Sequence, residues 1–175
     1  MSDQPSEVVP RGLLDTSVVV SLDRVTPGQL PAEPAMAAMT PAELAAGPHT
    51  TDDEDERARR QDRLQRVEAM LDPLPFDAAA ARAYGRIYAA TRARRRKPRG
   101  ARAVDLMIAA VALANDLPLF TCNPDDFKHL GGAGLTFHVV ERTEIPNPER
   151  DRQAYLELSE VEADDGNEAE SWGQP

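Results

Sequence analysis

Three acidic side chains lie where short apolar segments begin or end, and together they have the composition of a cation site. Asp15 follows the apolar residues 13–14, Glu43 lies near the start of a helical segment, and Asp105 is the sole charge within residues 104–114. Two carboxylates about 4 Å apart repel by roughly 4 kcal/mol at an effective dielectric near 20. Convergence of all three therefore predicts a divalent cation between them.

The chemistry that such a site supports is hydrolysis of a phosphodiester. Magnesium binds one or two carboxylates and keeps several waters, so positions stay open to phosphate oxygens. The ion activates water and offsets the negative charge that develops at phosphorus.

Each acid also has a purely structural interpretation. Asp15 suits an Asx turn, and Glu43 completes a capping box in which Thr40 would be the N-cap and Pro41 the first helical residue. Asp105 suits a helix N-terminus, a placement worth about 0.3–1 kcal/mol. Asp105 nevertheless favours a functional role, because a partly buried carboxylate costs several kcal/mol unless it is paired or binds a cation.

A further polar group follows the predicted strand at residues 117–121. Asn123 and Pro124 have the pattern of an N-cap and first helical residue, with Asp125 and Asp126 in the first turn. This capping role is the default interpretation. Thr121 and Asn123 would lie at a strand end, which is a position suited to contacting a ligand.

Seven basic residues precede Asp105 with no acid among them: Arg92, Arg94, Arg95, Arg96, Lys97, Arg99 and Arg102. Such runs are usually solvated loops. Beside Asp105, however, Arg99 and Arg102 are candidates to bind a phosphate backbone. Aromatic residues make up 5% of the chain, so base stacking on a broad platform is not expected.

The net charge of −10 is unevenly distributed along the 175 residues. Residues 147–175 contain nine acids and two bases, a net charge of −7, which leaves −3 for residues 1–146. We expect a flexible extension at 1–10, one domain at 11–146 and an acidic, disordered tail at 147–175. The tail is interpreted as solubilising. A mimic of nucleic acid that shields a basic groove is the less favoured alternative.

Several protein classes are disfavoured by composition. No apolar run approaches the roughly 20 residues of a membrane span, and the polar N-terminus lacks the layout of a secretory signal. Cys122 is the single cysteine, so an intramolecular disulfide is excluded, and His49, His129 and His138 lack zinc-ligand spacing. We expect a cytoplasmic protein.

Short apolar strands alternating with helices predict an α/β sandwich built on a parallel sheet. The predicted helices cover residues 52–71, 78–91 and 104–114, and the clearest strands cover 13–14, 117–121 and 135–140. The connecting segments are predicted as a proline-rich loop at 26–34, a basic loop at 92–102 and a flexible glycine loop at 131–134. Residues 36–39 could be a strand or the lead-in to a helix.

Three segments in this order resemble the PIN-domain nucleases, specifically the VapC-type toxins of toxin–antitoxin modules. They are LLDTSVVVSLD, MTPAELAAG and RRRKPRGARAVDLMIAAVALANDLPLFTCNPDDF, and the resemblance spans roughly residues 12–140. It implies a three-layer α/β/α sandwich with a central, mostly parallel sheet of about four or five strands. It also implies a magnesium-dependent endoribonuclease, with manganese as a plausible substitute. Such a toxin is commonly a homodimer and is neutralised by a VapB-type antitoxin whose tail lies across the active site.

The resemblance also assigns roles by position. Asp15 and Asp105 match the metal-binding aspartates, and Glu43 matches the middle glutamate. Where many relatives have a fourth acid this chain has Asn123, and Asp126 is the candidate to replace it. Thr121 is expected to help orient the site.

Two alternatives remain at this stage. Asn123 in place of an acid would suit a PIN-like binding module without turnover. The other is a nuclease for structured DNA, or one that matures ribosomal RNA, rather than a growth-arresting toxin.

Overall fold

A single parallel sheet forms the centre of the fold. The computed structural model describes residues 9–94 and 100–143, all within the unit Met1–Thr143. The strands are ordered β3-β2-β1-β4-β5, and every neighbouring pair is parallel. Their bounds are Arg11–Leu14 (β1), Glu33–Ala37 (β2), Pro73–Leu74 (β3), Leu119–Thr121 (β4) and Phe137–Val139 (β5). The acidic tail predicted at 147–175, and residues 1–8 of the extension predicted at 1–10, lie outside the described residues.

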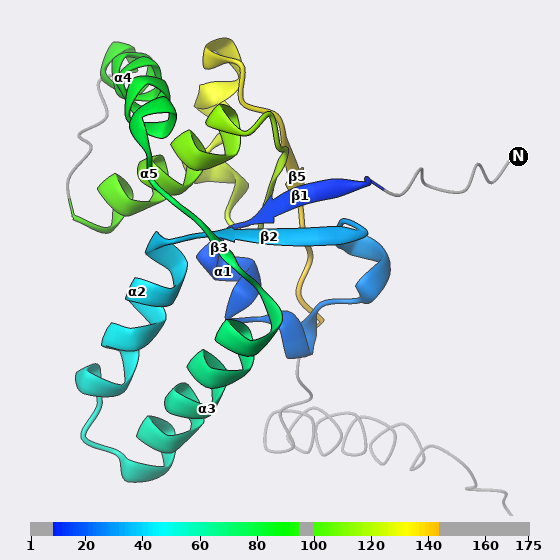
Figure 1. Cartoon of the computed structure of the whole chain (residues 1–175), viewed down its shortest axis with the longest axis vertical. Coiled ribbons are helices and arrows are strands. Elements are labelled where there is room, and N and C mark those ends of the chain that lie inside the picture. The colour runs from blue at the N-terminus through cyan, green and yellow to red at the C-terminus, as the bar shows by residue number, and fades with distance from the viewer. Residues whose placement is uncertain (1–8, 95–99, 144–175) are drawn as a thin grey trace, which may run out of the picture. The chain divides into compact units, whose positions relative to one another are not determined.

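Helices cover both faces of the sheet (Figure 1). The α-helices are Thr16–Val19 (α1), Met39–Ala46 (α2), Glu54–Met70 (α3), Ala78–Ala93 (α4) and Ala101–Ala114 (α5). Short 3-10 turns lie at Leu22–Arg24, Pro27–Gln29, Gly47–Thr50, Pro124–Asp126 and Lys128–Ala133. Within the described residues, no helix is both long and apolar enough to cross a membrane.

Two apolar cores lie on opposite faces of the sheet, and successive residues of β1 and β4 belong to different cores. Leu13 and Leu119 belong to the core packed by α4 and α5, whereas Leu14 and Phe120 belong to the core packed by α1, α2 and α3. Successive side chains of a strand point to opposite faces, so β1 and β4 each contribute side chains to both cores. The predicted α/β/α sandwich with a parallel sheet is confirmed.

Helix α4 ends later, and helix α5 begins earlier, than the sequence pattern predicted. Asp77 caps α4 as expected, its carboxylate accepting from the Ala80 backbone N–H at 2.9 Å. Helix α4 continues through Ala93 and α5 begins at Ala101, so the predicted basic loop is shorter than 92–102. Arg102 is therefore in the first turn of α5, while Arg99 lies outside the described residues.

Two predicted loops and the predicted final strand differ from the structure. The proline-rich loop ends earlier than expected, because β2 already begins at Glu33 and contains Pro34. Proline lacks an N–H, but β3 pairs only with Met36 and Ala37 of β2, so no bond to β3 is lost at Pro34. The glycine segment largely forms the 3-10 turn Lys128–Ala133, and the final strand is limited to Phe137–Val139.

Gly12 in β1 is needed for the packing of Phe120. A Cβ atom at Gly12 would overlap ring atoms of Phe120 and lie 3.2 Å from Cγ of Pro31. The ring has little room to withdraw, because it stacks on His138 with a centroid separation of 4.7 Å. Close packing of Phe120 therefore requires a residue without a Cβ atom at position 12 of the strand that leads to Asp15.

We predict that Gly12→Ala lowers the free energy of unfolding by about 1–3 kcal/mol through overpacking. Chemical denaturation measures the change. Gly85→Ala is the matched control, because a Cβ there meets no atom within 4 Å and alanine favours the helical backbone of α4 by about 0.5–1 kcal/mol. Equal stability of the Gly12→Ala variant and the wild type would contradict the packing argument.

Candidate functional site

The candidate site lies at the carboxyl edge of the sheet, where β1 and β4 end side by side. Asp15 directly follows β1, and Thr121 is the last residue of β4. The backbone N–H of Asp15 donates to the Phe120 carbonyl at 2.9 Å, which brings the two strand ends into register. In open parallel sheets this edge is where ligands bind.

Asp15 is held in place by two hydroxyl groups. Its side chain is 3% exposed, and its Oδ2 accepts from Ser17 Oγ at 2.7 Å and from Thr121 Oγ1 at 2.9 Å. Burial raises the pKa of Asp15, while the hydrogen bonds from Ser17 and Thr121 act in the opposite direction. The carboxylate is thus oriented by neutral donors instead of a cation.

The two hydroxyls are themselves fixed by the backbone that follows β4. Ser17 Oγ accepts from the Cys122 N–H at 3.1 Å, and Thr121 Oγ1 accepts from the Asn123 N–H at 2.9 Å. Each hydroxyl therefore donates to Asp15 and accepts from the main chain. This arrangement fixes the Asp15 carboxylate from both sides.

Glu43 approaches from α2 and is bound by a third hydroxyl. Thr16 Oγ1 donates to Glu43 Oε2 at 2.6 Å and lies 3.1 Å from Thr40 Oγ1. The predicted capping box is wrong: α2 begins at Met39 with Ala38 as N-cap, and no side chain caps it. Thr40 is fully buried, and its hydroxyl faces Thr16 rather than the start of the helix.

Asp105 has the strongest electrostatic perturbation of the site. Its pKa is raised to about 7. Burial is the largest cause, and the charges of Asp15, Asp126 and Glu43 follow in that order, while Arg102 acts in the opposite direction. The structure therefore brings together the four acids named from the sequence. Burial and the charges of the other three acids disfavour ionisation of Asp105, and Arg102 offsets this effect only in part.

Asp126 and Asn123 occupy different positions relative to this cluster. Asp126 Oδ1 lies 4.0 Å from Arg102 Nη2, and both side chains are more than one third exposed, so this ion pair contributes little to stability. Asn123 is the N-cap residue of its 3-10 turn but makes no side-chain cap, and its Oδ1 is 3.5 Å from an Arg142 nitrogen. Asp126, and not Asn123, supplies the fourth negative charge near Asp105.

The sequence interpretation missed the roles of three hydroxyl residues. Thr16 and Ser17 follow Asp15, which is the N-cap of α1, and both hydroxyls bind carboxylates. Thr40 was assigned to a cap. The available signal was the presence of two hydroxyl residues immediately after a candidate acid.

The donor set suits a hydrated divalent cation. All four acids offer hard oxygen ligands of the kind that magnesium prefers. Within residues 9–94 and 100–143, no three acidic, histidine or cysteine side chains already converge tightly enough to ligate one ion. Magnesium needs only one or two carboxylates and completes its octahedron with water, so the looser arrangement is compatible with it.

Comparisons with known proteins give one consistent family. Residues 13–133 match the PIN domain. The chain is 38% identical over 127 residues to ribonuclease VapC5 of Mycobacterium tuberculosis strain H37Rv, covering 70% of this chain and 89% of that protein.

Solved structures give the same result. The chain superimposes on the VapBC-5 toxin–antitoxin crystal structure from M. tuberculosis with a TM-score of 0.64 and 34% identity, covering 75% of this chain and 98% of that chain. VapBC2 from Rickettsia felis, bound to a DNA fragment from its promoter, has a TM-score of 0.57 over 75% of this chain and 99% of that chain. Its 19% identity shows likeness of fold alone.

We predict that Asp105→Asn stabilises the protein at pH 8 when no divalent cation is present. A carboxyl whose pKa rises on folding costs no stability below its unfolded pKa near 4, and the cost grows until the pH passes about 7. Water screens this partly exposed side chain, so we expect a gain of about 1–2 kcal/mol at pH 8 that disappears near pH 4.

Thermal or chemical unfolding across this pH range measures the effect. Asp72→Asn serves as the control, because Asp72 is exposed and lies between α3 and β3. A stability difference between Asp105→Asn and the wild type that stays constant from pH 4 to 8 would contradict the raised pKa of Asp105.

Proposed function

Because this chain belongs to the PIN-domain family, we propose that it is a cytoplasmic, magnesium-dependent endoribonuclease toxin neutralised by a VapB-type antitoxin. The observation that carries the proposal is the gathering of Asp15, Glu43 and Asp126 around Asp105, whose pKa is raised by burial and by the charges of these three acids. A divalent cation would offset the repulsion among the four carboxylates. The family match and the ribonuclease relative support RNA cleavage as the reaction.

Each side chain has a distinct role in the proposed site. Asp15 and Asp105 hold the cation, and Glu43 and Asp126 orient its water shell and the incoming nucleophile. Magnesium, when bound, acts as a Lewis acid that favours ionised water and offsets charge at phosphorus; manganese is a plausible substitute. Arg102, whose side chain is 38% exposed beside Asp126, is placed to bind a non-bridging phosphate oxygen.

Neutral hydroxyls suit this role better than cations would. Ser17 and Thr121 orient Asp15 through hydrogen bonds without cancelling the charge that attracts the metal. Thr16 does the same for Glu43. The result is a preorganised site whose oriented carboxylates are not neutralised by these donors and can be ionised together when a divalent ion binds.

The alternative of a binding module without turnover rested on Asn123. Asp126 weakens that alternative, because its charge acts on Asp105 while the Asn123 amide faces Arg142. A nuclease for DNA or for ribosomal RNA maturation would use the same acids, so substrate preference requires a direct measurement.

We predict that the purified protein cleaves single-stranded RNA with Mg²⁺ or Mn²⁺ and not with EDTA. Asp15→Asn and Asp105→Asn should each lower kcat at least about 100-fold, because each removes a cation ligand. Gel assays on defined RNAs and matched DNAs measure rate and preference, and Asp116→Asn, at the positive-φ turn after α5, controls for the loss of a remote acid. Metal-independent cleavage, or equal rates in all variants, would refute the proposal.

We further propose that the toxin forms a homodimer within its complex with the antitoxin. The toxin–antitoxin complexes among the structural matches support this partner. Co-expression with the cognate VapB-type antitoxin should yield a stable complex, relieve growth arrest and suppress RNA cleavage. Light scattering on the free toxin and on the complex measures stoichiometry. A monomeric toxin in both states, or undiminished cleavage in the complex, would contradict this part.

A further inference from the structure

A groove between α1 and α3 leads away from the acid cluster. Its first hollow is lined by Thr16, Glu43 and Arg63, among others. The next hollow shares Val20 and Arg63 with the first and extends toward Met70. The two hollows therefore form one path that starts at a candidate catalytic side chain and follows α3; we call this path the α1–α3 groove.

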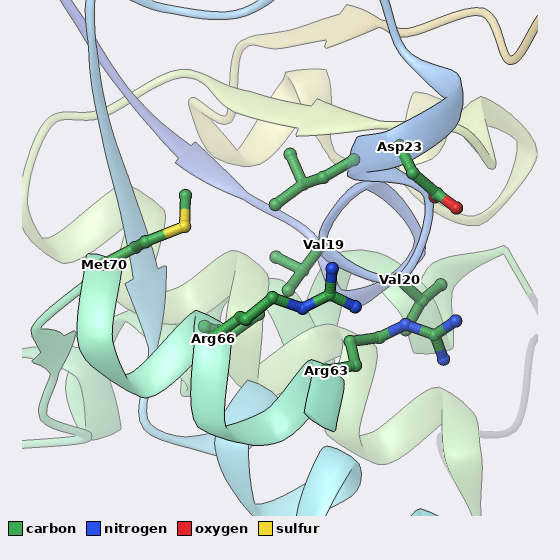
Figure 2. Close-up of a pocket in the computed structure, with 8 residues that line it drawn as sticks. Val19, Val20, Asp23, Arg63, Arg66 and Met70 are labelled. Carbon is green, nitrogen blue, oxygen red and sulfur yellow. The ribbon is translucent and has the colours of Figure 1, made fainter. Parts of the chain in front are cut away.

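Two arginines on the groove wall lack anionic partners in the described part of the chain. Arg60, one turn earlier, is fully engaged by the Gly47 carbonyl and by Glu56. For Arg63 the described contacts include no hydrogen bond or ion pair, and Arg66 makes one long contact of 3.4 Å to a backbone carbonyl. Figure 2 shows both guanidinium groups extending from α3 over Val19 and Val20. These charges have no structural role that the fold requires.

The spacing of the two arginines suits a repeating anion. Arg63 and Arg66 are three residues apart on α3, which places their Cβ atoms about 5–6 Å apart on one face. This separation is comparable to that between successive phosphates along a nucleic-acid strand. In the second hollow the one acid is Asp23, so the two guanidinium groups outnumber the carboxylates there. The first hollow is lined by Glu43 and by Glu56, and Glu56 is paired with Arg60.

The floor of the groove is apolar and partly exposed. Met70 is 67% exposed at the far end, and Val19, Val20 and Leu22 line the opposite side. Methionine sulfur packs well against aromatic rings, and the faces of nucleobases are aromatic. Each hollow measures about 260 Å³, below the roughly 300–1,000 Å³ of small-molecule sites, which favours an extended ligand over a compact one.

We propose that the α1–α3 groove binds the single-stranded RNA that flanks the cleaved bond. Arg63 and Arg66 bind successive phosphates, while Met70 and the valines contact bases. This inference rests on the proposed ribonuclease activity and adds the path that the substrate takes to Glu43. A chain with a net charge of −10 thereby presents local positive charge where its polyanionic substrate lies.

The test compares Arg63→Gln/Arg66→Gln with the wild-type full chain in steady-state cleavage of a fluorescent single-stranded RNA. We expect KM to rise at least about tenfold with kcat within twofold, because the arginines bind substrate away from the reacting phosphate. The slope of log(kcat/KM) against log[salt] should become less steep by about 1.4, or about 0.7 for each lost phosphate contact. Arg82→Gln/Arg86→Gln on α4 removes the same charge from the opposite layer and should change neither quantity.

A second measurement uses the wild-type protein and so does not depend on folding of a variant. Neutral methylphosphonates replace single phosphates along the RNA, one position at a time. Two adjacent positions on one side of the cut should raise KM, and these positions should lose their effect in the double variant.

The outcomes separate the groove from the activity. Cleavage by the wild type with unchanged KM and salt slope in Arg63→Gln/Arg66→Gln would overturn the groove assignment alone. Weakened binding of the antitoxin without any effect on RNA would identify the groove as a protein-docking surface and would also overturn it. Absence of RNA cleavage by the wild type would refute the proposed function itself.

Discussion

Repulsion among carboxylates at one sheet edge is the constraint around which the rest of the structure is organised. Asp15, Glu43 and Asp126 all act on Asp105, and among the described residues Arg102 opposes them. Such an arrangement is unfavourable by itself, so it must be maintained by the surrounding fold. Two apolar cores on opposite faces of the sheet provide that rigidity, and hydroxyl donors fix the acids without neutralising them.

Much of the architecture could be predicted from local sequence pattern. The apolar segment ending at Asp15 and the helix that contains Asp105 both have strong local signals, and together they indicate a parallel sheet with acids at one edge. Glu43 fits a capping box by local pattern, and the resemblance to a known family favoured its role in the site. Asp126 was chosen over Asn123 only provisionally, and the charge acting on Asp105 supports that choice.

The features that could not be predicted depend on contacts distant in sequence. Thr16 meets Glu43 across 27 positions and Thr121 meets Asp15 across 106, and no local rule identifies such pairs. Local rules were also misleading, because residues 40–43 have the pattern of a capping box while their side chains serve the site. A residue that fits a local capping motif can instead hydrogen-bond to a residue distant in sequence, when folding brings that residue close to it.

The strand order has a consequence for synthesis of the chain. The first strand made, β1, lies in the middle of the sheet, and its neighbour β4 is among the last elements to leave the ribosome. Translation proceeds from the N-terminus at about 5–20 residues per second, so Asp15 emerges seconds before the Thr121 hydroxyl that orients it. A nascent chain therefore carries an unpaired strand edge and an incomplete acid cluster. The acid cluster therefore cannot be completed before β4 has been synthesised and has paired with β1.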